Sequence, residues 1–194
     1  MLVLASNSPR RLELLQQAGV KIGQIIDPKI DETSLKSELP LSYVRRMALA
    51  KSYSVEADLN DFVLTADTIV MRGRRILGKP ENRKVAESYL KLLSGHKHRV
   101  ATSVCLAHKD KIKVRTVLTV VKMKRLSSVE ISNYLDSGEW KGKSGGYAIQ
   151  GNAAKFIPSI SGSYTNVVGL PLTETINLLT GNGFIIDNKV PINE

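Results

Sequence analysis

An eight-residue segment near the N-terminus combines residue types that bind phosphate, Leu4-Ala5-Ser6-Asn7-Ser8-Pro9-Arg10-Arg11. Residues 2–4 predict a buried strand, and Pro9 begins an amphipathic helix with Ser8 as its N-cap and Gly19 at its end. A helix N-terminus attracts anions because it presents free N–H groups and the positive end of the helix dipole. Arg10 and Arg11 add charged forks that fit phosphate oxygens, although the dipole disfavours cations there. The segment therefore predicts an anion site, with a capped helix carrying exposed arginines as the alternative.

Asp67 and two lysines are the next candidates for chemistry on an anionic substrate. Asp67 follows the apolar stretch 62–66, and a carboxylate at the end of an α/β strand faces the ligand. There it could bind a divalent cation or act as a general base, while capping a turn is an equally good interpretation. Lys79 in Gly78-Lys79-Pro80 and Lys51 late in a predicted helix could each contact phosphate. Taken alone, each lysine is better explained as an ordinary exposed side chain.

Two polar segments offer further contacts. Gln150 ends the glycine-rich stretch 141–152, and its amide could hydrogen-bond the edge of a nucleobase. Asp31 and Glu32 lie in the polar loop 27–39 and could supply a second carboxylate for a metal ion, although neither has a partner at metal-ligand spacing. The charged residues of stretch 141–152, including Lys143, could also be ordinary surface.

Several other sites are not supported by the sequence. The three histidines lack metal-ligand spacing, and His96 and His98 are predicted to lie on the surface at the start of a strand. Cys105 is predicted to be a small core residue. There is no P-loop and no dinucleotide-binding glycine motif. Ser8 has no recognisable triad partner, so a covalent serine mechanism is not indicated.

The predicted elements alternate between strands and helices, which indicates an α/β fold with a mixed sheet. Strands are predicted at 2–4, 20–26, 62–66, 69–71, 76–77, 98–107, 112–122 and 154–160. Helices are predicted at 9–18, 41–57, 81–93, 129–135 and 172–179, with irregular segments at 27–39 and 141–152. The turn at 72–74 favours a hairpin between 69–71 and 76–77.

Length and composition limit the class of protein. The 194 residues suit a single domain spanning 1–194 with two lobes, and no stretch resembles a membrane span or a secretory signal. One cysteine cannot form an internal disulfide, which fits the cytoplasm. The net charge of +10 calls for an anionic partner, but the basic residues are scattered and aromatic residues are few. A nucleic-acid face is therefore the lesser option, and a solvated surface with one anion site is favoured.

Six segments in order make the chain resemble the Maf family of nucleoside triphosphate pyrophosphatases. They are the N-terminal segment above, Ala66-Asp67-Thr68, Gly78-Lys79-Pro80, Leu93-Ser94-Gly95, Gly145-Gly146-Tyr147-Ala148-Ile149-Gln150-Gly151 and Gly162-Ser163-Tyr164-Thr165-Asn166-Val167-Val168-Gly169-Leu170-Pro171-Leu172. The resemblance implies an elongated two-lobed α/β fold with a mixed sheet, related to the inosine triphosphatases, with the nucleotide in a cleft between the lobes. It also implies a cytoplasmic location and frequent dimerisation.

The resemblance further implies an activity and a role for each matching residue. The family hydrolyses a nucleoside triphosphate between the α- and β-phosphates with Mg²⁺, Mn²⁺ or a similar divalent cation. Asp67 becomes the general base and a metal-linked carboxylate, and Glu32 a further metal or acid residue. The phosphate-binding residues implied are Ser8, Arg11, Lys51 and Lys79. No covalent intermediate is needed, which agrees with the missing nucleophile.

Three positions indicate the branch of the family. Members that prefer dTTP and UTP resemble this chain in having Arg, Thr and Gln where Arg10, Thr68 and Gln150 stand, whereas members that prefer 7-methyl-GTP carry Trp, Gln and Glu. A cationic methylated base favours an aromatic face and a carboxylate, but a neutral pyrimidine needs an amide partner. The hypothesis is therefore a house-cleaning dTTP/UTP pyrophosphatase. The alternatives are a nucleotide- or nucleic-acid-binding regulator of cell division and a 7-methyl-GTP-preferring enzyme.

Overall fold

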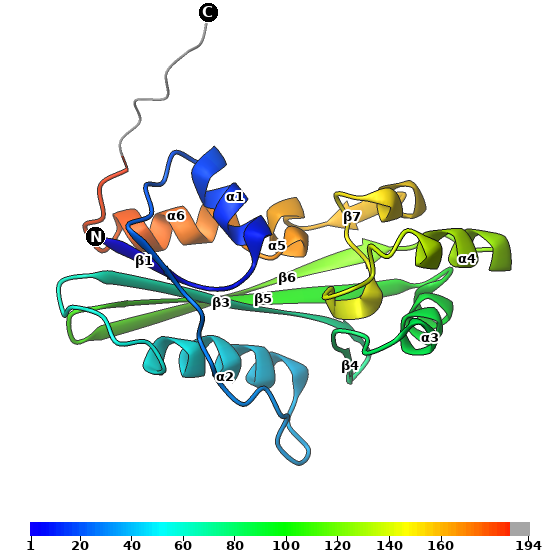
Figure 1. Ribbon diagram of the computed structural model, residues 1–194, viewed down its shortest axis with the longest axis horizontal. Coiled ribbons are helices and arrows are strands. Elements are labelled where there is room, and N and C mark those ends of the chain that lie inside the picture. The colour runs from blue at the N-terminus through cyan, green and yellow to red at the C-terminus, as the bar shows by residue number, and fades with distance from the viewer. Residues whose placement is uncertain (187–194) are drawn as a thin grey trace, which may run out of the picture.

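A computed structural model describes residues 1–186, which form one seven-stranded mixed sheet covered by helices (Figure 1). The strand order is β2-β1-β3-β5-β6-β7, with β4 paired to β3 outside this path. The strands are β1 (Leu2–Ala5), β2 (Gln24–Ile26), β3 (Phe62–Arg72), β4 (Arg75–Leu77), β5 (Lys97–His108), β6 (Lys111–Lys122) and β7 (Ser159–Ser161). β1 pairs in parallel with β2 and β3, and every other pairing is antiparallel. The predicted α/β class and mixed sheet are confirmed.

The helices divide the molecule into two parts along the three long strands. α1 (Pro9–Gln17), α5 (Tyr164–Val168) and α6 (Leu172–Thr180) cover one face of the sheet, and α2 (Pro40–Tyr53) covers the other (Figure 1). α3 (Arg83–Leu93) and α4 (Ser128–Asp136) lie near the start of β5 and the end of β6, at the right of Figure 1 and far from the turn that joins these two strands. The molecule is therefore elongated and two-lobed, as predicted. No helix within residues 1–186 is long and apolar enough to cross a membrane.

An unpaired stretch of β3 is the feature that makes room for a site. β1 ends at Ala5, which lies opposite Thr65, while β3 runs on to Arg72. On the edge that β1 has left, β4 joins β3 only from Val70 onwards. The four residues between Thr65 and Val70 therefore have a strand neighbour on one side only.

Alternation along β3 sends its side chains to two different layers. Ile69 packs with Val44 of α2, and the Thr65 hydroxyl donates to the carbonyl of Ala48 in the same helix at 2.7 Å. Ala66 and Val70, on the other face, belong to the large core beneath α1, α5 and α6 and around α3 and α4. Because successive strand residues point to opposite faces, Asp67 and Thr68 emerge on opposite sides of the sheet at its open edge.

Some predicted elements differ from the structure. The strand predicted at 154–160 is wrong over its first part, because Asn152–Phe156 form a 3₁₀ helix and only Ser159–Ser161 pair with β6. The strand predicted at 20–26 is reduced to Gln24–Ile26, and α5 was not predicted. The two strands predicted at 62–66 and 69–71 are one continuous strand. Residues 187–194 of the predicted single domain lie outside the described residues.

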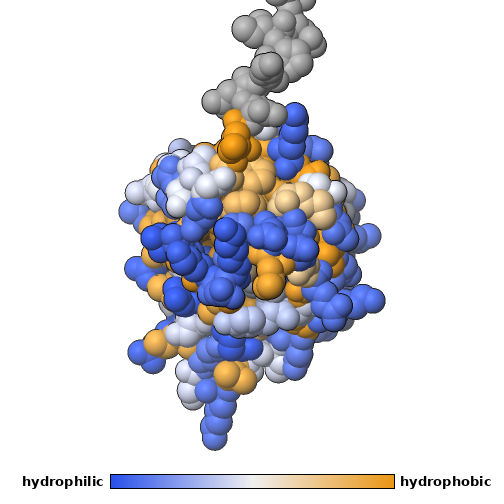
Figure 2. Space-filling view, turned by 90° about the vertical axis from the view of Figure 1, so that its left-hand side faces the viewer, coloured by the Kyte–Doolittle hydropathy of each residue, from blue (hydrophilic) through white to orange (hydrophobic). Residues whose placement is uncertain are grey.

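The basic surface is dispersed, as the sequence indicated. The β5–β6 turn and the adjoining part of β6 carry exposed cations, among them Lys111, Lys113 and Arg115. Figure 2 shows the end of the molecule seen from the left of Figure 1, where hydrophilic residues cover most of the face and hydrophobic ones are interspersed. Such a surface is typical of solvated strand faces.

Candidate active site

A cleft of about 340 Å³ opens at the unpaired edge of β3 and brings all nine predicted site residues together. They are Ser8, Arg10, Arg11, Glu32, Lys51, Asp67, Thr68, Lys79 and Gln150. The first turn of α1, the end of α5 and the loop before Gln150 form one wall, and Lys51 of α2 reaches the cleft from the opposite face of the sheet. Five cationic side chains line the cleft against three carboxylates, so its charge favours an anion.

The start of α1 presents its polar end to this cleft. Ser8 is the N-cap and Pro9 the first helical residue, as predicted, but the Ser8 side chain makes no capping hydrogen bond. Its backbone N–H donates instead to the Ser6 hydroxyl at 3.2 Å. The Ser8 hydroxyl is consequently available to a ligand that reaches the helix N-terminus.

Arg11 is a buried cation held by neutral acceptors. It is 8% exposed. Its Nε donates to the carbonyl of Gly169 at 2.8 Å, Nη1 to the Ser6 hydroxyl at 2.9 Å and Nη2 to the Thr68 hydroxyl at 3.1 Å. A guanidinium has five N–H donors, so these bonds leave two of them unused. Burial lowers the pKa of Arg11, and the charge of Asp67 opposes that shift. Within residues 1–186 no carboxylate forms an ion pair with it, and an anion entering the cleft would supply the missing charge.

Lys51 joins the two candidate catalytic carboxylates on the other face. Its Nζ lies 2.6 Å from Asp67 Oδ1 and 2.9 Å from Glu32 Oε1. Burial of Glu32 opposes its ionisation, but the hydrogen bond and charge of Lys51, with Lys79 and Arg11 beyond, lower the pKa of Glu32 on balance. The hydrogen bonds of residues 1–186 leave Asp67 Oδ2 without a partner. Asp67 thus has one oxygen fixed by Lys51 and one open to the cleft.

Asp67 lies in the cleft, as predicted, but the reason given by the sequence is wrong. It is not at the end of a strand, because β3 continues through it and pairs it with Ser103 of β5. It is accessible because β1, the neighbouring strand, has ended at Ala5. The edge of the sheet, and not the end of its own strand, exposes this carboxylate.

The remaining predicted residues are held less firmly. Lys79 Nζ is 3.9 Å from Glu32 Oε2, and its side chain is 62% exposed. Gln150 is exposed at the rim, and the hydrogen bonds of residues 1–186 include none from its amide. Arg10 Nε donates to the Val168 carbonyl at 3.3 Å. Both Gln150 and Lys79 are therefore free to adjust to a ligand.

Glu32 is brought to the cleft by contacts from α2, although its loop has no regular secondary structure. The Tyr43 hydroxyl donates to the Glu32 carbonyl at 2.8 Å, and Arg46 Nη2 donates to the Thr33 carbonyl at 3.1 Å. Arg46 also forms a two-pronged ion pair with Glu38, whose pKa it lowers to about 2. Tyr43 and Arg46 thus hold the backbone at Glu32 and at the residue that follows it.

The donor set can accommodate a divalent cation only in part. No group of three or more metal-ligating side chains exists in residues 1–186. Two carboxylates, Asp67 and Glu32, do converge on one point through Lys51. Mg²⁺ commonly takes one or two carboxylates and completes its coordination with substrate phosphates and water. The residues present therefore fit a cation that arrives with a polyphosphate.

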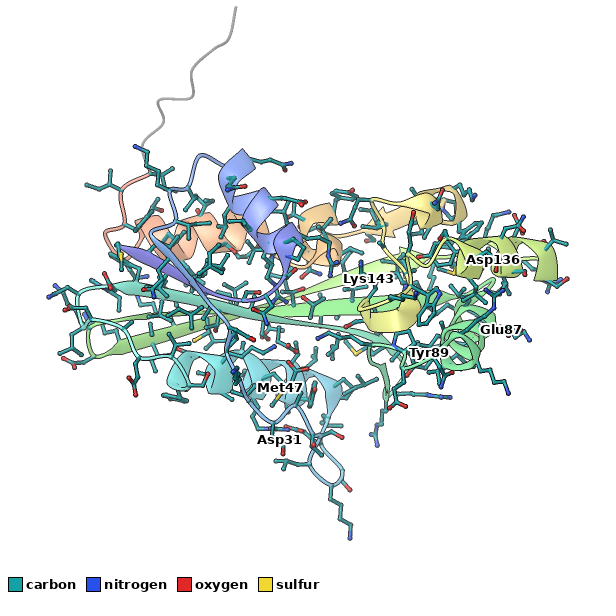
Figure 3. The ribbon with its side chains drawn as sticks, in the orientation of Figure 1. Asp31, Met47, Glu87, Tyr89, Asp136 and Lys143 are labelled. Carbon is teal, nitrogen blue, oxygen red and sulfur yellow. The ribbon has the colours of Figure 1, made fainter. Side chains whose placement is uncertain are left out.

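Lys143 is a residue of the cleft that the sequence did not single out. It lines the cleft, and desolvation with the nearby charge of Arg10 lowers its pKa. Figure 3 shows it on the side of the sheet that carries α1 and α5, whereas Asp31 lies on the side of α2. Its position in the same glycine-rich loop as Gln150 was the available signal.

The prediction that His98 lies on the surface is wrong. It is 2% exposed, and its Nε2 is 2.7 Å from the hydroxyl of Tyr147, which lines the cleft. Burial lowers the pKa of His98 to about 4. The error arose because His98 follows the first residue of β5 and points to the inner face. Cys105 is buried, as predicted.

Comparisons with known proteins identify the family and the fold of the chain. The family model described as Maf-like protein matches residues 1–182. A dTTP/UTP pyrophosphatase of Roseobacter denitrificans is 53% identical over 95% of this chain and 98% of its own, and one of Ruegeria sp. is 52% identical over 94% of both. Among solved structures, a HAM1 protein from Coxiella burnetii is similar with a TM-score of 0.52 and 13% identity, covering 93% of this chain and 98% of its own. The last similarity concerns the fold alone and confirms the predicted architecture.

Proposed function

The chain belongs to the Maf-like protein family, and on that premise we propose that it hydrolyses dTTP and UTP to the nucleoside monophosphate and pyrophosphate. Relatives whose sequences are 50 to 53% identical to this one over nearly the full chain carry the name dTTP/UTP pyrophosphatase. The single observation in the structure that carries the proposal is the buried Arg11 guanidinium beside the Lys51–Asp67 pair. One cleft thus offers an anion-binding cation and a carboxylate within the same open edge of the sheet.

The phosphate chain would bind along the wall formed by α1. Arg11 offers its two unused N–H donors, and Ser8 its uncapped hydroxyl. Lys51 and Lys79 contribute charge from the facing side. These groups also stabilise the charge that moves onto the leaving pyrophosphate, and such electrostatic stabilisation commonly contributes most of an enzyme's rate enhancement.

Asp67 would activate the attacking water. Its free Oδ2 accepts the proton of a water whose oxygen bonds to the α-phosphorus, while the bond from that phosphorus to the bridging oxygen breaks. The products are the nucleoside monophosphate and pyrophosphate. Lys51 holds Oδ1 and so fixes the direction of Oδ2. A divalent cation held by Asp67 and Glu32 would lower the pKa of water and screen phosphate charge.

Gln150 would select the base, because its exposed amide can both donate to and accept from a pyrimidine edge. Arg10 and Thr68 complete the set of three residues that indicates the dTTP/UTP branch. We also propose a cytoplasmic enzyme, which agrees with the free buried Cys105, and the homodimer stays a prediction.

The experiment is pyrophosphate release from dTTP, UTP, CTP, GTP and 7-methyl-GTP with Mg²⁺ or Mn²⁺. We expect turnover of dTTP and UTP to exceed that of the other nucleotides and to require the metal. Preference for 7-methyl-GTP would refute the branch assignment. Binding of nucleotides without any pyrophosphate release would refute the activity and favour a binding or regulatory role.

A further inference from the structure

The hydroxyl of Thr68 is already engaged within the protein. It accepts a hydrogen bond from Arg11 Nη2 at 3.1 Å. It also lies 3.0 Å from the Thr102 hydroxyl and 3.3 Å from the Gly169 carbonyl. A threonine hydroxyl has one proton to donate, so the direction of that proton decides what Thr68 can offer a ligand.

The hydrogen bonds of Thr102 determine where the hydroxyl proton of Thr68 points. The Thr102 hydroxyl donates to the Asn166 carbonyl at 3.0 Å, so its single proton is used there. Thr102 can then only accept from Thr68, and the Gly169 carbonyl can likewise only accept. Either partner takes the Thr68 proton inward. Thr68 thus has no proton left for a nucleobase.

The same contacts hold Arg11 from two sides. Asn166 is 0% exposed, and its amide donates to the Val100 carbonyl at 3.1 Å and to the Thr119 hydroxyl at 2.9 Å. These bonds fasten α5 to β5 and β6, and the carbonyl of Gly169 that follows α5 accepts from Arg11 Nε. Thr102 joins the α5 side of this network to Thr68, the other partner of the guanidinium.

We propose that Thr68 acts on the phosphate chain through Arg11 and not on the nucleobase, and that Thr102 is a positioning residue that fixes the Thr68 hydroxyl. This inference rests on the proposed function, because it concerns how the same cleft binds a triphosphate. Gln150 would be left as the residue that contacts the base.

The test uses inorganic tripolyphosphate, which has the phosphates and no base. Its affinity is measured by calorimetry for the wild type and for Thr68→Val and Thr102→Val, which remove a hydroxyl and keep the branched shape. Thr102→Ser restores the hydroxyl. Thr175→Val is the matched control, because Thr175 is also 0% exposed and donates to a backbone carbonyl, that of Pro171, at 2.8 Å.

We expect Thr68→Val to weaken tripolyphosphate binding about tenfold and Thr102→Val about threefold, as loss of one charged and one neutral hydrogen bond implies. Thr102→Ser should recover the affinity, Thr175→Val should keep it, and the kcat/KM ratio of dTTP to CTP should stay unchanged in all four variants.

Three results would overturn the inference. In the first, tripolyphosphate binding is unchanged in Thr68→Val while the dTTP to CTP ratio shifts, so that Thr68 contacts the base. In the second, Thr175→Val loses as much affinity as Thr102→Val, so that the effect is general destabilisation. In the third, the wild type does not bind tripolyphosphate. A wild type that binds it but releases no pyrophosphate from any nucleotide refutes the proposed function alone, and the comparison of variants still decides this inference.

Discussion

The two sides of the cleft differ in how firmly the protein holds their charged side chains. On the α1 side, Arg11 is 8% exposed and makes three hydrogen bonds of 2.8 to 3.1 Å to three separate segments. On the opposite side, Glu32 and Lys79 have side chains that are 45% and 62% exposed and lie 3.9 Å apart. The Arg11 side chain is thus held by several bonds before any ligand arrives, whereas within residues 1–186 Glu32 is held by one short ion pair, to Lys51 at 2.9 Å, and Lys79 by none.

The difference follows from the elements that carry each residue. Arg11 lies in a helix that contacts α5, whereas Glu32 lies in the loop 27–39, which has no regular secondary structure and is held by Tyr43, Arg46 and the ion pair of Glu32 with Lys51. A preorganised cation stabilises charge without reorganising during the reaction. A half-exposed carboxylate held by a single ion pair can turn to a metal ion that enters with the substrate. The contrast indicates that phosphate binding is prepared in the fold, while the metal site is completed on binding.

Asp67 stands between the two sides, and its substitution should have the largest effect. Asp67→Asn keeps the shape but removes the base, so we expect turnover of dTTP to fall about 10³-fold, within the range for general-base catalysis. The measurement is pyrophosphate release at saturating dTTP and metal.

Tripolyphosphate binding provides the control for that substitution. Because the Arg11 side is independent of Asp67 for its hydrogen bonds, Asp67→Asn should bind tripolyphosphate within about threefold of the wild type or more tightly, since a negative charge is lost. A parallel collapse of binding and turnover would contradict the separation of the two sides.

The Arg11 side should be sensitive to a change of shape at constant charge. Arg11→Lys keeps a cation but cannot satisfy Gly169, Ser6 and Thr68 together, so kcat/KM should fall about 10²-fold, equivalent to about 3 kcal/mol. Lys79→Arg on the opposite side is the matched change, and its effect should stay below about threefold because Lys79 has no fixed geometry to lose. Equal losses in the two variants would remove the contrast.

Substitution of Glu32, on the more exposed side of the cleft, should change the concentration of metal ion that the enzyme requires. Glu32→Gln should raise the half-saturating Mg²⁺ concentration about tenfold and leave metal-free tripolyphosphate affinity within about twofold. Burial opposes the ionisation of Glu32, but Lys51 and its charged neighbours keep the pKa of Glu32 below its usual value, so its carboxylate is available to a metal ion at neutral pH. Asp31→Asn changes the adjacent carboxylate, which does not line the cleft, and should leave the metal titration unchanged.

The contrast also explains which parts of the site could be predicted from sequence. Ser8, Arg10 and Arg11 follow from local rules, because the turn between a strand and a proline-started helix is specified within one segment. Asp67 was identified as well, but the sequence could not show that β1 ends beside it, since strand pairing is a contact between distant residues. The family resemblance, and not periodicity, grouped these positions into one site.

Tertiary contacts account for most of what could not be predicted. α5 has five residues and no amphipathic period long enough to detect, so periodicity did not predict the helix or the burial of Asn166. The 3₁₀ helix over residues 152–156 overlaps the start of the stretch 154–160 that was predicted as a strand, and burial of Ala153 and Phe156 packs it against the core. The clamp of Tyr43 and Arg46 on loop 27–39 depends on side-chain geometry that no spacing rule contains.

His98 contacts the glycine-rich loop through its hydrogen bond with Tyr147. The smallest effect that we predict concerns this contact, and it is a loss of stability in acid. Burial lowers the pKa of His98 to about 4, against about 6.5 for an unfolded chain. Between these values the unfolded state binds a proton that the folded state does not, so stability is full above about pH 6.5 and falls as the pH falls towards 4. The shift corresponds to about 3 kcal/mol in total.

His98→Gln can keep a hydrogen bond to the Tyr147 hydroxyl without titrating, so its urea midpoint should fall less than that of the wild type between pH 7 and pH 5. His96→Gln, at an exposed neighbour, should follow the wild type, and an equal slope in His98→Gln would place the acid sensitivity elsewhere.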